Sequence, residues 1–185
     1  MQTKHKLITL AACTVLAAPA LAADPSASLN RGWIEYAGSA LVGNNKVQDD
    51  KNAYWIDEGV GTWMGQAVRS WYVFWDPKSP LQLKGSISFD QPILFVHDEK
   101  AELKATAAFQ NAGVGYDYSR ALVGLETGDR KNTSWAGQTL TLKWNASNPG
   151  DHIRVMTAVP EPATYAMFGA GLLALAFLAR RRRAD

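Results

Sequence analysis

The chain has only one cysteine, Cys13, among its 185 residues. This cysteine lies inside an apolar N-terminal run, so the chain beyond that run contains no thiol. Disulfide bonds, thiolate metal ligation and cysteine nucleophiles are therefore excluded from a mature protein that has lost this run. Histidine is also scarce, since only His97 and His152 follow the N-terminal segment. The sequence shows no nucleophile elbow, zincin helix or phosphate-binding loop.

The N-terminus has the pattern of a secretory signal peptide. Two lysines precede an apolar run over residues 7–16, and Ala20 and Ala22 supply the small residues that signal peptidase needs at its cleavage site. We therefore predict a signal peptide over residues 1–22, so that the mature chain begins at Ala23 or at the next residue.

Two alternatives concern the same N-terminal segment. If it is not cleaved, it forms a first membrane helix, although its apolar run is short for that role. Residues 10–13 also resemble a lipobox, which would make Cys13 a lipid attachment point. Only six residues separate Lys6 from Cys13, and the apolar run continues to Ala22, so the cleaved signal peptide is the preferred interpretation.

The C-terminus combines a proline-containing element, an apolar run and an arginine cluster. In order, these are Pro160, Glu161 and Pro162, then residues 163–179, then Arg180, Arg181, Arg182 and Arg183. A 17-residue apolar helix rises about 25 Å, slightly less than the roughly 30 Å hydrocarbon core of a bilayer. It can span a membrane that thins a little, so we predict a transmembrane helix over residues 163–179.

The flanks of this run predict its orientation. Clustered arginines are retained on the cytoplasmic side, which places the C-terminus inside the cell. Prolines lack an amide donor and restrict the preceding residue, so the helix cannot extend backward through Pro160 and Pro162. The proline element is then expected at the outer face of the membrane.

This order of parts over residues 159–183 resembles the PEP-CTERM sorting signal of exopolysaccharide-producing Gram-negative bacteria. The resemblance implies recognition by exosortase, a membrane enzyme thought to cut near the proline element. Pro160, Glu161 and Pro162 are then substrate residues, and the sorting chemistry belongs to the partner enzyme. The implied location is a transient membrane anchor, followed by the cell surface or extracellular matrix. The alternative is an ordinary tail anchor with a proline-containing linker.

The charge of the central segment differs from that of the whole chain. Residues 23–158 contain 13 lysines and arginines and 15 carboxylates, which gives about −2, whereas the whole chain is +2. The basic balance therefore comes from the targeting ends, and the sequence gives no indication of nucleic-acid binding.

Residues 23–158 are predicted to form one all-β domain, a single jelly-roll-like β-sandwich. Alternating or fully apolar runs predict strands over residues 33–36, 68–75, 81–90, 93–96, 139–145 and 153–157. The run over 68–75 is apolar on nearly both faces, which favours a central strand covered on each side. Residues 99–109 fit either a short helix or a strand. Through residues 70–77, 85–90 and 150–155, the layout also resembles that of ectodomains often found ahead of PEP-CTERM tails.

Candidate catalytic and metal-binding residues are few. His97, Asp98 and Glu99 are consecutive, and neighbouring residues of a strand point to opposite sides, so we expect a solvated loop and assign no catalytic residue. We predict that the protein is not an enzyme.

Metal binding by His97 with Asp98 or Glu99 is one alternative, but calcium is the better candidate because oxygen ligands gather in two segments. These are Asn44, Asn45, Asp49 and Asp50, and then Asp57 and Glu58 before Gly59. Neither segment has an EF-hand spacing, so no metal ligand is assigned and solvated acidic loops are expected.

Three of the seven tryptophans lie in glycine-rich, loop-like surroundings. Trp55, Trp63 and Trp135 are the candidate platform for a carbohydrate ring, whereas Trp71 and Trp75 share one face of an apolar strand and are expected in the core.

Taken with the tail, the sequence predicts a structural or adhesive component of an exopolysaccharide or biofilm matrix. A carbohydrate-binding module is the alternative, and a membrane-tethered hydrolase would need convergent carboxylates that the sequence does not show.

Overall fold

A computed structural model describes residues 23–159, 169, 171–172 and 175. The predicted signal peptide lies outside the described residues, as do Pro160, Glu161, Pro162 and the arginine cluster. Gly169, Gly171, Leu172 and Leu175, which belong to the predicted apolar run, are helical. Within the described part of the chain, no helix has the length and apolar character needed to cross a membrane.

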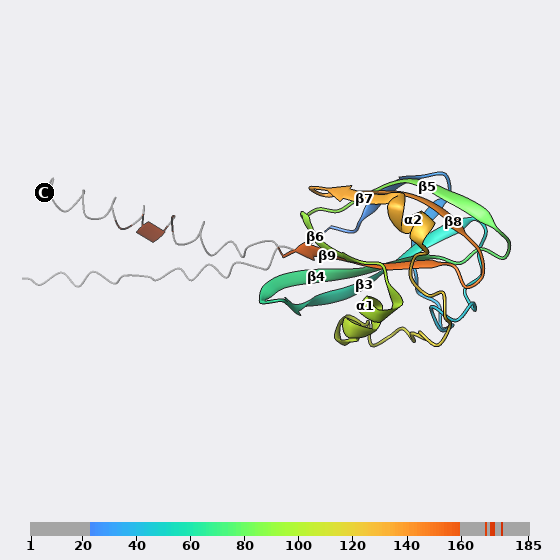
Figure 1. Cartoon of the computed structure of the whole chain (residues 1–185). Helices are drawn as coiled ribbons and strands as arrows, with labels where there is room; N and C mark the ends of the chain where they lie inside the picture. The colour runs from blue at the N-terminus through green and yellow to red at the C-terminus, as the bar shows by residue number, and fades with distance from the viewer. Residues whose placement is uncertain (1–22, 160–168, 170, 173–174, 176–185) are drawn as a thin grey trace, which may run out of the picture. The chain divides into compact units, whose positions relative to one another are not determined.

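The described domain is mostly β and contains two sheets (Figure 1). The four-stranded sheet is antiparallel throughout. Its order is β1 (Ser26–Leu29), β5 (Leu81–Ser88), β8 (Thr139–Ala146) and β7 (Thr133–Ala136). The predicted strands over 81–90 and 139–145 therefore exist, and they pair with each other.

The second sheet has five strands. Its order is β2 (Gly32–Glu35), β3 (Asn52–Trp63), β4 (Gln66–Trp75), β9 (Asp151–Ala158) and β6 (Ile93–His97). Only β2 and β3 are parallel to each other, whereas the other neighbours are antiparallel. The prediction of an all-β sandwich is confirmed at this level.

The main core lies between the two sheets. Strand β8 alternates buried and exposed residues, with Leu140, Leu142 and Trp144 facing inward, because successive side chains of a strand point to opposite faces. They belong to one buried cluster with Trp71 and Val73 of the other sheet. Aromatic and aliphatic packing thus holds together a domain that has no cross-links.

Strand β4 is buried on both faces, as its sequence predicts. Tyr72 and Phe74 point away from the main core and join a second buried cluster with Leu103. Leu103 belongs to α1 (Lys100–Ala105), the short helix that lies over this outer face (Figure 1). A short 3₁₀ turn, η1 (Ala107–Phe109), follows, so the open choice over 99–109 is resolved as helix.

Three further elements were not predicted from the sequence: β1, β7 and α2 (Thr127–Lys131). The treatment of residues 52–63 as loop-like was wrong, because they form the long strand β3. Its pairing with β4 shifts register between Asp57 and Gly59, and Gly59 has a φ of +85°. Gly61 lies so close to the Phe109 ring that a Cβ atom would meet it at 2.6 Å. These glycines resemble loop signals in the sequence but serve a bulge and a close approach.

Candidate functional site

The end of β9 is where the sandwich meets the proposed sorting segment. β9 lies inside the five-stranded sheet, between β4 and β6. Its last residue, Ala158, pairs with Val68 of β4 and donates its backbone N–H to the Pro92 carbonyl at 2.9 Å. Val159 is the next residue, and Pro160 follows it. In sequence, therefore, a single residue separates the last strand from the proline element.

The described chain starts just after the predicted cleavage site. The backbone nitrogen of Ala23 donates to Oδ2 of Asp90 at 3.1 Å, and β1 begins at Ser26. The predicted cleavage residues Ala20 and Ala22 lie outside the described part of the chain.

His97, Asp98 and Glu99 engage different partners. His97 is buried, and its ring lies edge-on to Trp63 and stacks on Phe95, so the expectation of a solvated loop was wrong for this residue. Burial lowers the pKa of His97. Asp98 and Glu99 both form ion pairs with Arg130 instead. The histidine and the two carboxylates therefore have different partners.

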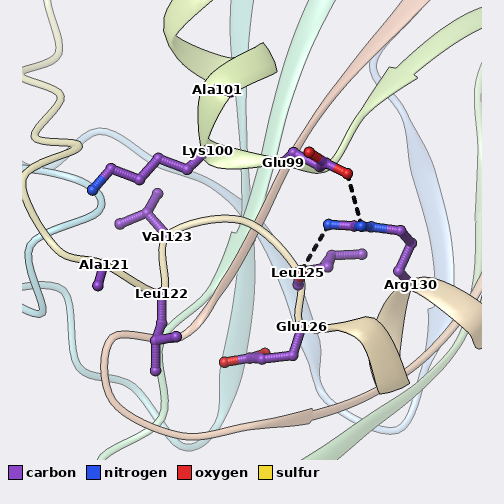
Figure 2. A pocket seen from close by; sticks show the side chains of 9 residues that line it. All are labelled: Glu99, Lys100, Ala101, Ala121, Leu122, Val123, Leu125, Glu126 and Arg130. Atoms are coloured by element: carbon purple, nitrogen blue, oxygen red, sulfur yellow. Dashed lines mark hydrogen bonds and ion pairs between the residues drawn. The ribbon is translucent and has the colours of Figure 1, made fainter.

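Arg130 borders a pocket of about 250 Å³ between the start of α1, the segment 121–126 and α2 (Figure 2). Its guanidinium lies 2.9 Å from Oδ1 of Asp98 and 2.8 Å from Oε1 of Glu99, and it donates to the Leu125 carbonyl at 3.2 Å. Burial raises the pKa of Asp98, while Arg130 acts in the opposite direction. The cation at this pocket is thus already held by two carboxylates, which fits a structural clamp between α1 and α2.

The acidic residues that the sequence offered for calcium are used for other contacts. Asp49 accepts hydrogen bonds from the Tyr54 hydroxyl at 2.7 Å and from the Asn52 amide at 2.9 Å. Asp57 pairs with Arg69, with 2.5 Å between Oδ2 and Nη2. These contacts order a turn and join β3 to β4, so they replace the solvated loops that the sequence suggested.

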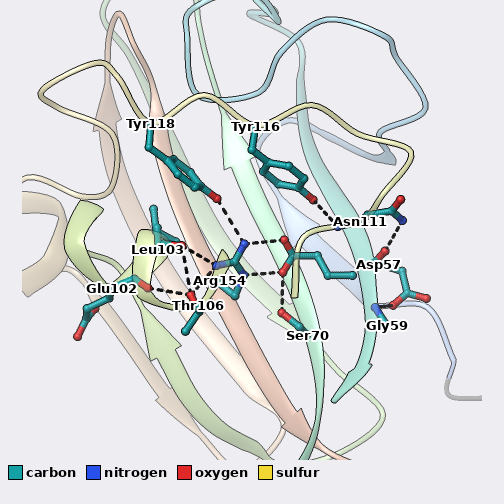
Figure 3. Close-up of polar contacts among 11 residues, drawn as sticks. Asp57, Gly59, Ser70, Glu102, Leu103, Thr106, Asn111, Tyr116, Tyr118 and Arg154 are labelled. Carbon is teal, nitrogen blue, oxygen red and sulfur yellow. Dashed lines mark hydrogen bonds and ion pairs between the residues drawn. The ribbon is translucent and has the colours of Figure 1, made fainter. Parts of the chain in front are cut away.

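Glu58 belongs to a buried ion pair with Arg154 of β9. The guanidinium Nε and Nη2 lie 2.6 and 2.7 Å from the two carboxylate oxygens, and both side chains are fully buried. Nη1 donates to the Leu103 carbonyl at 2.9 Å and to the Thr106 hydroxyl at 2.5 Å (Figure 3). Nη2 also donates to the Tyr118 hydroxyl at 3.3 Å. Bidentate, charge-assisted contacts of this kind are strong and geometrically specific.

The same pair ties the outer layer to the sheet. Burial acts to lower the pKa of Arg154, but the contacts with Glu58 outweigh it, and the pKa lies above its usual value. Ser70 of β4 donates its hydroxyl to Glu58 at 2.6 Å. One polar centre, whose hydrogen bonds are satisfied within the domain, therefore joins five parts of it: strands β3, β4 and β9, helix α1 and the segment around Tyr118. Its role is structural.

Only one of the three candidate platform tryptophans is well exposed. Trp55 is 6% exposed, lies on β3 and packs edge-on against Trp71, so its assignment to an exposed loop was wrong. Trp63 ends β3 and is half-buried against His97 and Phe109. Trp135 of β7 is 46% exposed. Trp55 faces the main core, and Trp63 and Trp135 lie on strands of different sheets, so the three side chains form no common platform.

One set of residues was missed by sequence reasoning. Among the described residues, Glu126, Asp129 and Asp151 form the only group of three potential ligands close enough to share a metal ion. Glu126 and Asp129 are separated by a spacing of three, which places side chains on the same face of a helical turn. That spacing was a usable signal, whereas the approach of Asp151 depends on the tertiary fold.

Comparison with known families identifies the C-terminal segment. Residues 158–183 match the PEP-CTERM protein-sorting motif, which confirms the resemblance seen in the sequence. The chain therefore carries a PEP-CTERM sorting domain, which indicates exosortase-targeted sorting and export toward the cell surface. No curated protein and no solved structure matches the chain.

Proposed function

We propose that this protein is an exported surface protein, processed by exosortase, whose β-sandwich is a structural or adhesive component of the exopolysaccharide or biofilm matrix. The observation that carries this proposal is the sorting motif over residues 158–183, which begins where β9 ends. The ion pairs of Arg154 and Arg130 join separate elements of the domain, and this supports a structural role for these centres.

The proposed topology follows from the flanks of the apolar run. The signal peptide over 1–22 starts translocation, and residues 163–179 stop it as a transmembrane helix. Arg180 to Arg183 keep the C-terminus in the cytoplasm. The ectodomain and the proline element then lie on the side of the membrane where exosortase acts.

Cleavage before Ala23 also suits the fold of the domain. The backbone nitrogen of Ala23 already lies 3.1 Å from the Asp90 carboxylate. A newly formed α-ammonium group at this position would carry positive charge beside that carboxylate, and such a pair is weakly favourable at an exposed site. The N-terminal and C-terminal processing events that we propose both leave the strands of the sandwich intact.

The proposal is tested by cell fractionation in the native host. We expect the protein to reach the cell surface or matrix in wild-type cells and to stay in the membrane fraction in cells that lack exosortase. Joint replacement of Pro160 and Pro162 by alanine should reproduce this retention in wild-type cells. Glu35→Gln, a change at an exposed residue of β2, is the matched control and should be released normally. Normal release without exosortase would refute the proposed processing.

A carbohydrate-binding module remains the second candidate, and the exposure of Trp135 is the observation that favours it. An exposed indole can stack on a sugar ring. The exported protein is titrated with host polysaccharide while tryptophan fluorescence is recorded. A saturable change that Trp135→Ala abolishes and Trp63→Phe keeps would support this role, and no change in the wild-type protein would remove it.

A further inference from the structure

Three carboxylates converge beside the start of β9. Glu126 precedes α2, Asp129 lies within it, and Asp151 is the first residue of β9. One oxygen from each lies within 4.8 Å of the others. Oxygens that share a calcium ion at 2.3–2.6 Å are separated by at most about twice that distance, so the three groups can bind one ion together.

The second observation is an unsatisfied buried oxygen in this group. Asp151 is 1% exposed, and its Oδ2 atom accepts no hydrogen bond from an N–H or O–H donor of the described segment. Its carboxyl group lies within hydrogen-bonding reach of the Glu126 carboxyl group, where the two acids can share only a proton. A buried carboxyl oxygen without a partner is costly, and such atoms are rare unless an ion, a water or a ligand completes the site. Asp129 is also buried, and its Oδ1 is oriented by the Asn145 backbone N–H at 2.8 Å.

No basic side chain of the described residues pairs with this group. No salt bridge within residues 23–159 joins Glu126, Asp129 or Asp151 to a lysine or arginine. Arg130 follows Asp129 in sequence but pairs with Asp98 and Glu99. Figure 2 shows the Glu126 carboxylate pointing away from the Arg130 guanidinium.

We propose that Glu126, Asp129 and Asp151 form a calcium site that fastens α2 to the first residue of β9. Calcium prefers carboxylate and carbonyl oxygens and accepts six to eight of them in flexible geometry. Glu126 is exposed, so water can complete the coordination from its side. The set contains neither histidine nor cysteine, which argues against zinc.

Bound calcium would stabilise a specific part of the domain. α2 follows the pocket segment that ends at Glu126, and β9 continues to the sorting motif. A shared ion would thus fix the pocket wall to a strand of the five-stranded sheet. Such a site belongs to the folded domain and does not depend on exosortase processing.

The test uses the exported protein purified from its host. Its melting temperature and binding heats are measured with calcium, with magnesium and with a chelator. Sites of extracellular modules bind calcium at about 10⁻⁴–10⁻³ M, so about 10 mM calcium should raise the melting temperature by roughly 4–10 °C. Magnesium should have a much smaller effect because it requires near-ideal octahedral geometry.

Two variants assign the effect to the three carboxylates. Glu126→Gln changes the exposed ligand, and Asp151→Asn changes one of the two buried ligands. Each should weaken calcium binding by about tenfold or more. Glu35→Gln on β2 is the control and should keep the wild-type calcium response. If Asp151→Asn does not fold, Glu126→Gln and the wild-type binding heats still decide the question.

Three results would overturn the proposal. The first is a wild-type protein that shows neither binding heat nor a melting shift with calcium, which would indicate that a shared proton holds the carboxylates together. The second is an equal response to magnesium, which contradicts the assignment to calcium. The third is an undiminished calcium response in Glu126→Gln, which would place the ion elsewhere.

Discussion

Two buried ionisable groups, Arg154 and Asp151, lie three residues apart on β9, and their surroundings differ in charge. Arg154 is bound to Glu58 through two short contacts, and both side chains are fully buried. The Asp151 carboxyl group lies beside the carboxylates of Glu126 and Asp129, and none of the ion pairs within residues 23–159 includes it. The first group balances its charge with residues of the chain itself, whereas the second leaves an excess of negative charge.

The chain supplies the counter-charge for Arg154, whereas the group around Asp151 requires a cation from outside the chain. The Arg154 centre joins residues that are 96 positions apart, so it forms only when the sheet and its outer layer are both in place. It needs no further partner, because its hydrogen bonds are made within the domain. The Asp151 group lacks such a partner, which is why we assign an ion to it.

Removal of the Arg154 side chain should have the largest effect on stability. Arg154→Met leaves Glu58 buried without its cation, and breaking a buried pair in this way costs about 3–5 kcal/mol. Urea unfolding of the exported protein measures the loss. Adding Glu58→Leu to this variant should recover a large part of it, because the uncompensated charge is then gone. A single variant as stable as the wild type would contradict the structural role of the pair.

Asp76 provides a second test of an unpaired buried carboxyl group. This residue directly follows β4, is buried, and its Oδ1 has no hydrogen-bond partner among residues 23–159. Burial raises the pKa of Asp76 to about 7, while a backbone contact with Val47 acts in the opposite direction. The unfolded chain releases this proton near pH 4, but the folded chain retains it up to about pH 7.

The contribution of Asp76 to stability should therefore fall as the pH rises from about 4 to about 7, because its carboxyl group holds a proton in the folded state but not in the unfolded state over that range. The contribution of Asp76 should be roughly 2–4 kcal/mol. Asp76→Asn should remove this part of the slope, which urea midpoints measured across the range in the presence of a chelator would show. An unchanged slope in the variant would mean that Asp76 is not the titrating group.

The smallest effect is expected for the partly exposed pair between Arg69 and Asp57. Their side chains are 17% and 31% exposed, so water already screens the interaction. Arg69→Met should cost about 1 kcal/mol or less, with part of it due to the lost contact of the guanidinium with the Trp71 ring. The same urea experiment applies, and a loss equal to that of Arg154→Met would show that burial does not distinguish the two pairs.

Local patterns in the sequence were sufficient for several elements. Strands β5 and β8 were predicted because their polar and apolar residues alternate, which gives each strand one polar and one apolar face. Strand β4 was predicted because both of its faces are apolar. The sorting motif was found because its parts are contiguous and their order is specific. In each of these cases the information lies within a short window of the chain.

Other features depend on contacts that no short window contains. β3 was missed because its glycines, which serve a bulge and the packing of Phe109, resemble loop residues. Trp55 was placed on the surface for the same reason. The pairing of Glu58 with Arg154 and the approach of Asp151 to α2 require the folded sheets. Only the spacing between Glu126 and Asp129 gave a local signal of the carboxylate group.

Mass spectrometry of the carboxyl end of the native protein tests the central claim most directly. The protein is purified from its host with and without exosortase, and its C-terminal peptide is sequenced in both samples. We predict a chain that ends near Pro160, Glu161 and Pro162 in wild-type cells, and a chain that retains residues 163–185 in cells lacking the enzyme. An intact carboxyl end in both samples would contradict exosortase processing and leave a permanently membrane-anchored protein.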